Sequence, residues 1–119
     1  MALPVDFASA VSTAKPSLVA VFARQNGAGA GILWSKDGLV LTNRHVLGRH
    51  QPKVLLADER KLDAEVIATD EEVDLALLRV HADDLPAAQI GDSTQLRVGE
   101  LVVTLGHPWG SATQPALAW

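Results

Sequence analysis

The chain has 119 residues, which is enough for one domain with one modest core. Hydrophobic residues make up 48% of it and charged residues 20%, a balance typical of a folded globular protein and not of a disordered or membrane-spanning one. The net charge is -4 and the basic residues form no patch that could follow a phosphate backbone, so no nucleic-acid partner is expected. Because the sequence contains no cysteine, it excludes disulfides, a thiol nucleophile and cysteine-ligated zinc.

Residues 1–6 lack the basic and apolar regions of a secretory signal or membrane anchor. The sequence therefore indicates either a cytoplasmic protein or one whose signal was removed, and localisation stays open.

The residues that follow predict a short helix. Asp6 is suited to cap a helix, and Pro16 should end it. We expect this helix to pack as a lid. Its apolar positions recur at helical spacing: Phe7, Ala10, Val11 and Ala14.

From Leu18 onward the sequence changes to short apolar or β-branched runs separated by turn residues, which indicates an all-β fold. The Asp37-Gly38 pair predicts a tight hairpin turn, because glycine accepts a positive φ. Six strands without a long helix between them predict a closed antiparallel barrel. The predicted strands are residues 18–23, 28–34, 39–42, 53–57, 62–68 and 75–80.

The last third of the chain follows a different pattern. Residues 81–97 are polar and interrupted by proline and glycine, which predicts a connection. Residues 99–106 are strongly β-prone and predict a seventh strand, followed by a Gly- and Pro-bearing tail with nothing to pair against. A strand without partners leads us to expect that the chain is part of a larger protein.

Several runs together carry a family resemblance that covers about residues 16 to 110. They are residues 27–33 (GAGAGIL), 37–46 (DGLVLTNRHV), 66–80 (VIATDEEVDLALLRV), 91–100 (GDSTQLRVGE) and 106–110 (GHPWG). In this order and spacing they resemble the trypsin-like serine proteases of the HtrA/Deg type. The last run departs from the family, which usually has Asn-Pro-Phe-Gly where this chain has His-Pro-Trp-Gly.

The resemblance implies two catalytic residues, His45 as general base and Asp74 as the carboxylate that orients it. A serine hydroxyl is a poor nucleophile until a neutral imidazole can take its proton. The imidazole needs a buried carboxylate that accepts its Nδ1 proton and stabilises the imidazolium. His45 follows the end of one predicted strand and Asp74 precedes the start of another, so rigid elements can set their geometry.

The serine nucleophile itself is not expected in this chain. Gly91-Asp92-Ser93 is similar to the nucleophile motif of trypsin-like enzymes, but Thr94 follows where a glycine is needed for the oxyanion-forming turn. Ser111 has neither a strand before it nor a glycine after it. We therefore interpret Ser93 as a turn residue and Ser111 as part of the tail, and expect the chain alone to be inactive.

The resemblance also implies a domain organisation. Residues 1–83 would form the N-terminal helix and the first six-stranded barrel of the two-barrel trypsin-like fold. Residues 84–97 would link the barrels, and residues 98–119 would form the first strand and tail of an incomplete second barrel. In the family the second barrel supplies the serine and the oxyanion hole, and the substrates are proteins or peptides.

Two functions remain open from the sequence. The first is the N-terminal part of a serine endopeptidase; the second is a non-catalytic binding module, or half-protease, that docks with a partner supplying the second barrel. Residues 101–105 could allow self-association. No cofactor and no metal are expected, because His45, His50, His81 and His107 show no short ligand spacing.

Overall fold

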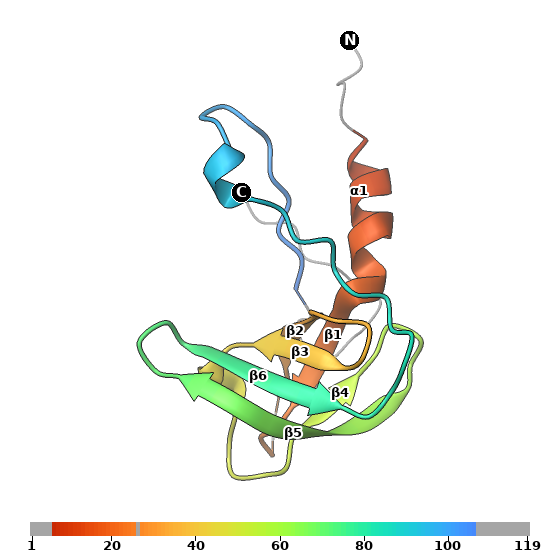
Figure 1. Cartoon of the computed structure of the whole chain (residues 1–119), viewed down its shortest axis with the longest axis vertical. Coiled ribbons are helices and arrows are strands. Elements are labelled where there is room, and N and C mark those ends of the chain that lie inside the picture. Colours follow the sequence, from red (N-terminus) through yellow and green to blue (C-terminus); the bar gives the residue numbers. More distant parts are fainter. Residues whose placement is uncertain (1–5, 26, 107–119) are drawn as a thin grey trace.

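The computed structural model describes residues 6–25 and 27–106 of the chain. Within this part, antiparallel strands close into a barrel in the order β1-β2-β3-β6-β5-β4 (Figure 1). The strands are β1 (Leu18–Phe22), β2 (Gly29–Leu33), β3 (Leu39–Thr42), β4 (Lys53–Leu55), β5 (Lys61–Asp70) and β6 (Leu75–Val80). The helix α1 (Phe7–Ala14) precedes the barrel, and the short 3-10 turns are η1 (Lys15–Ser17), η2 (Arg44–Val46) and η3 (Ser93–Gln95).

The barrel is stabilised by side chains that alternate toward its interior. In β6, Ala76, Leu78 and Val80 are buried, whereas the residues between them are less so. The buried core contains Val19, Val21, Leu33, Val40, Val54, Leu56, Ala64, Leu78, Val80 and Leu85. Each strand is paired on both sides, so no sheet edge is left open. The all-β class and the six-stranded barrel predicted from the sequence are confirmed.

The hairpin between β2 and β3 forms where the sequence predicted it. The Trp34 N–H donates to the carbonyl of Leu39 over 2.8 Å, which closes the turn formed by residues 35–38. Gly38 has φ 112°, a conformation that only glycine adopts readily. The turn residue that the Asp-Gly pair indicated is therefore required by the backbone.

The helix α1 forms as predicted but does not act as a lid. Asp6 caps it, since its side chain accepts a hydrogen bond from the Ser9 N–H over 3.2 Å. However, none of its residues is buried, and it projects from one end of the barrel (Figure 1). The reason lies in the connection: α1 runs through η1 directly into β1, so no loop can fold the helix back over the barrel.

Along β5, a side chain is buried in the barrel only in the first half of the strand. Ala64 is buried, but Val66 and Ile67 are 46% and 48% exposed. The pairing of β5 with β6 shifts register between Val66 and Ala68, and a bulge of this kind exchanges the faces to which side chains point. The second half of β5 and its turn therefore extend beyond the core.

No strand forms in residues 99–106, although their composition favours one. A strand needs a neighbour for its N–H and C=O groups, and in the described part of the chain none pairs with this segment. Leu101 and Val102 are 58% and 65% exposed. The expected seventh strand is thus absent from this structure, and self-association through residues 101–105 stays a prediction.

The connection after β6 contains η3 as its regular element and is pinned to the barrel at its start. Leu85 is 2% exposed and its N–H donates to the carbonyl of Lys36 over 3.0 Å. The Ala88 N–H donates to the carbonyl of Leu33 over 2.8 Å. Barrel packing thus continues past residue 83, and the boundary predicted there stays a prediction. Across residues 6–25 and 27–106, every helix falls short of the length and apolar character that a membrane crossing requires.

Candidate active site

The pairing of β3 with β6 brings the site together. These strands are antiparallel and their register sets Thr42 opposite Ala76, so the end of β3 lies beside the start of β6. Thr42 is buried and its hydroxyl donates to the carbonyl of Ala30 over 2.7 Å, which fixes the end of β3 to β2. The segment after β3 and the segment before β6 are therefore neighbours, and they bring together His45 and Asp74, which are 29 positions apart in the sequence.

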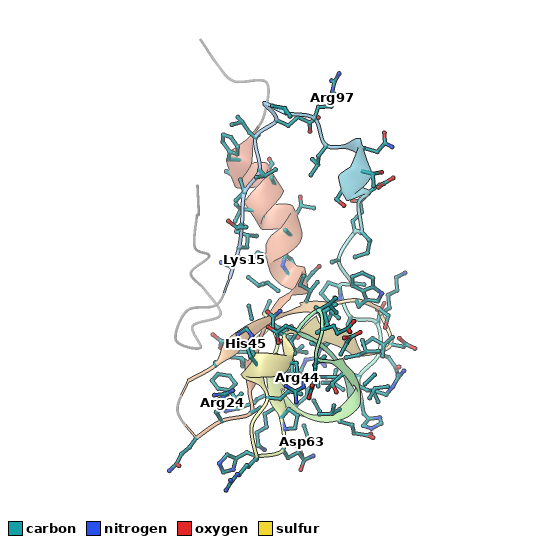
Figure 2. The ribbon with its side chains drawn as sticks, turned by 90° about the vertical axis from the view of Figure 1, so that its left-hand side faces the viewer. Lys15, Arg24, Arg44, His45, Asp63 and Arg97 are labelled. Atoms are coloured by element: carbon teal, nitrogen blue, oxygen red, sulfur yellow. The ribbon has the colours of Figure 1, made fainter. Side chains whose placement is uncertain are left out.

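His45 lies in η2, the single 3-10 turn that follows β3. The Leu47 N–H closes this turn on the carbonyl of Arg44 over 3.0 Å. The Arg24 guanidinium donates to the carbonyls of His45 and Leu47, and it lies on the same side of the barrel as His45 (Figure 2). The turn that carries His45 is thus held from the loop that follows β1.

Asp74 ends the turn between β5 and β6. Asp70 stabilises the start of this turn, because its side chain accepts a hydrogen bond from the Glu72 N–H over 2.9 Å. Asp74 has φ 54°, in the left-handed region that few residues other than glycine adopt. Its carbonyl accepts hydrogen bonds from the Asn43 side chain over 2.9 Å and from the Arg44 N–H over 3.2 Å.

The two predicted catalytic side chains meet in a two-point contact. Asp74 Oδ2 lies 2.5 Å from His45 Nδ1, and Asp74 Oδ1 accepts a hydrogen bond from the His45 backbone N–H over 2.8 Å. This contact fixes both the ring and the backbone that carries it. The carboxylate is 44% exposed and the imidazole 70%, so the expected buried carboxylate is not found.

The hydrogen bonds at Asp74 determine its charge and the tautomer of its partner. Two hydrogen bonds from His45 lower the pKa of Asp74 below its ordinary value of 3.8. The bond from the His45 side chain has the larger effect and the bond from the His45 backbone N–H the smaller. An ionised carboxylate only accepts hydrogen bonds, so the proton between the two side chains belongs on Nδ1. His45 Nε2 then carries a free lone pair, as a general base requires.

A shallow hollow of about 480 Å³ lies next to His45. In the described part of the chain it is lined by Arg24, Val46, His45 and the run Gly27, Ala28 and Gly29, none of which carries a hydroxyl or a thiol. A Cβ at Gly29 would lie 2.3 Å from a methyl group of Val46, so the glycine lets η2 sit close to β2. The hollow offers a base and a cation but no nucleophile.

Acid should destabilise the chain. Several carboxyls that accept local hydrogen bonds have a folded-state pKa below the ordinary 3.8; among the described residues they include Asp6, Asp37, Asp58, Asp74 and Asp92. Because the unfolded chain binds more protons as pH falls through this range, stability is complete above about pH 5 and declines below about pH 4. We expect the melting temperature to fall between pH 5 and pH 3, and less steeply in Asp74→Asn. A melting temperature that rises on acidification would contradict this.

The other residues singled out from the sequence lie elsewhere. Ser93 belongs to η3, which projects away from the barrel, whereas the segment after it runs back toward the barrel (Figure 1). Its neighbour Thr94 donates from both N–H and O–H to Asp92, as in an ordinary polar turn. Ser111 and His107 lie outside the described residues. Within residues 6–25 and 27–106, no three His, Cys, Asp or Glu side chains gather as a metal site would require.

Three contacts at the site were not predicted from the sequence. They are the bonds of Arg24 to the His45 turn, the bond of Asn43 to Asp74, and an ion pair of 2.7 Å between Arg44 and Glu71. Asn43, Arg44 and Glu71 lie in the runs that carry the family resemblance, but the resemblance assigns them no role. Arg24 lies outside those runs and gives no local signal.

Comparisons with known proteins agree with this geometry. A family model described as a trypsin-like peptidase domain matches residues 29–119. A probable periplasmic serine endoprotease, DegP-like, from Hahella chejuensis is 51% identical over 83 residues, covering 69% of this chain and 18% of that protein. A protein of the same description from Pseudomonas fulva is 45% identical over 83 residues, covering 69% of this chain and 17% of its own length.

A solved structure gives the same result in three dimensions. The crystal structure of the serine endoprotease from Yersinia pestis matches with a TM-score of 0.80 and 30% identity, covering 91% of this chain and 41% of that one. The chain therefore belongs to the trypsin-like peptidase domain family. Within that family it is of the HtrA/Deg type, and it spans less than one fifth of the length of the curated relatives named above.

Proposed function

We propose that this chain supplies the base half of the catalytic machinery of an HtrA/Deg-type serine endopeptidase. In this proposal His45 is the general base and Asp74 orients it and stabilises the imidazolium. The serine nucleophile and the oxyanion hole come from protein outside residues 6–106. The substrates are proteins or peptides, and the compartment is the periplasm, after which the DegP-like relatives are named.

The observation that carries the proposal is the two-point contact between Asp74 and His45. A lone imidazole next to a carboxylate could be an ordinary surface ion pair, which contributes little and fixes no geometry. The chain contains such a pair, His81 Nε2 with Glu65 Oε1 at 2.8 Å. At His45, in contrast, the carboxylate also accepts the backbone N–H, so ring and turn are held together.

The absence of a nucleophile from the hollow supports the second part of the proposal. A triad serine must lie within hydrogen-bond reach of Nε2, about 2.6–3.2 Å. The described residues that line the hollow carry no hydroxyl, and Ser93 belongs to a polar turn on the projecting segment. The site therefore has an open face where a serine from a second barrel would fit.

A chimera tests this function. Residues 1–106 of this chain are joined to the region of the Hahella chejuensis relative that follows its matched segment, and casein hydrolysis is measured. We expect the chimera to hydrolyse casein and the 119-residue chain alone to show no activity. The intact relative serves as the positive control.

Two results would contradict the proposal. One is hydrolysis by the 119-residue chain alone that is lost on Ser93→Ala, since the nucleophile would then lie within it. The other is a folded but inactive chimera. Proper folding is checked by the melting temperature of the chimera relative to the intact relative.

A further inference from the structure

Asp74 reaches His45 from an uncommon backbone conformation. Its φ of 54° lies in the left-handed region, where an L-residue is less stable than in extended or helical backbone. The next residue, Leu75, already pairs with Asp70 in the β5–β6 ladder, so the turn ends at Asp74. The Asp74 carbonyl belongs to the same backbone from which the carboxylate extends. Bonds that hold this carbonyl therefore restrict the backbone of Asp74 and fix the position from which its side chain reaches His45.

The Asp74 carbonyl is held from the segment that carries His45. Asn43 Nδ2 donates to it over 2.9 Å, and the Arg44 N–H donates over 3.2 Å, at the long end of the normal range. Asn43 occupies the position before η2, where an asparagine side chain usually bonds to an N–H of its own helix. No such cap bond is made here. The Asn43 amide instead donates to the Asp74 carbonyl and so links the turn after β3 to the turn before β6.

We infer that Asn43 is a positioning residue for the catalytic pair: its amide holds Asp74 in the left-handed conformation from which the carboxylate meets both N–H groups of His45. The inference rests on the proposed function, because it assigns Asn43 a role only through His45 and Asp74. Asn43 does not contact the reacting atoms. It ties the turn before β6 to the turn after β3, so the base and its carboxylate move as one unit.

A second link between the same turns provides a matched control. The Arg44 side chain forms an ion pair of 2.7 Å with Glu71, but the two side chains are 45% and 76% exposed. Exposed pairs of this kind contribute little to rigidity. Arg44→Gln removes this link and keeps the backbone N–H that reaches Asp74. It should therefore leave the pair unchanged, whereas loss of the Asn43 amide should not.

The test uses Asn43→Leu and Asn43→Ala in the 119-residue chain. Leucine keeps the approximate shape of asparagine and removes the amide, both its donor and its acceptor; alanine also removes the bulk. The readouts are hydrogen exchange of the His45 amide and titration of the Asp74 carboxyl by NMR. In both variants we expect the His45 amide to exchange about fivefold faster, the loss of one ordinary hydrogen bond. We also expect the pKa of Asp74 to rise toward its ordinary value.

Two other amides distinguish positioning from a general loss of stability. The Thr94 N–H donates to Asp92 Oδ1 over 3.0 Å, and the Val80 N–H donates to the carbonyl of Gly38 over 2.9 Å. Neither should change in the Asn43 variants. The inference is overturned if the amides of His45, Thr94 and Val80 all exchange faster by the same factor. It is also overturned if neither the exchange rate of the His45 amide nor the pKa of Asp74 changes. If Asp74 titrates at its ordinary value already in the unsubstituted chain, it is the proposed function that fails.

Discussion

Replacing Asp74 with asparagine in the active chimera is expected to lower kcat about 10,000-fold. The side chain keeps its size, but its NH2 group can turn toward His45 Nδ1 and donate to it. The imidazole proton then moves to Nε2, where the lone pair is needed, and the base can no longer accept a proton. His45→Ala should cost about 100-fold more, because it removes the base itself. The measurement is kcat for a peptide substrate at neutral pH.

A matched variant shows whether the effect belongs to this carboxylate. Asp63 is an exposed aspartate of β5 that pairs with Lys53 over 2.9 Å (Figure 2). Asp63→Asn makes the same chemical change on the same barrel, away from His45, and should leave kcat unchanged. If Asp74→Asn and Asp63→Asn are equally active, Asp74 does not orient the base.

Replacing Gly38 with alanine is expected to cost about 3 kcal/mol or more of unfolding free energy, a large part of what a small domain has. Gly38 has φ 112°, and an added Cβ would lie 2.0 Å from the carbonyl oxygen of Val80. That oxygen belongs to the backbone of β6 and cannot rotate away. The hairpin must therefore separate from β6, which also breaks the hydrogen bond from the Val80 N–H to Gly38. Urea unfolding gives the free energy.

Gly27→Ala separates the two causes of this loss. Gly27 has φ 98°, but an added Cβ would meet no atom within 4 Å. The substitution therefore introduces backbone strain without a clash, and we expect a cost of about 1 kcal/mol. Equal losses for Gly27→Ala and Gly38→Ala would mean that the contact with Val80 has no part in the effect.

Local sequence patterns predicted the barrel well, because most of its strands are defined by their own residues. Residues 39–42 and 75–80 form strands with the predicted bounds, since apolar runs there end at turn residues on both sides. The segment 99–106 shows the limit of such patterns. Its residues favour a strand, but a strand also needs a neighbour, and none among the described residues pairs with it.

The catalytic pair could be predicted, but its support could not. His45 and Asp74 stand in runs that resemble the family, and the pairing of β3 with β6 brings them together. The bond from Asn43 to the Asp74 carbonyl depends on the path of two turns that are distant in sequence. Hydrophobic periodicity carries no information about such a bond. The half-exposed state of Asp74 was missed because burial depends on which other parts of the protein cover the site.

The tautomer of His45 tests the central claim most directly, namely that Asp74 fixes this imidazole as a base. Nitrogen NMR shifts of the ring, measured in the 119-residue chain near pH 8, show which nitrogen carries the proton in the neutral form. We predict the proton on Nδ1 of His45, facing Asp74, and on Nε2 of His81, which faces Glu65. His81 thus gives the opposite result within the same sample. A proton on Nε2 of His45 would contradict the proposed base, because that nitrogen could not accept a proton from serine.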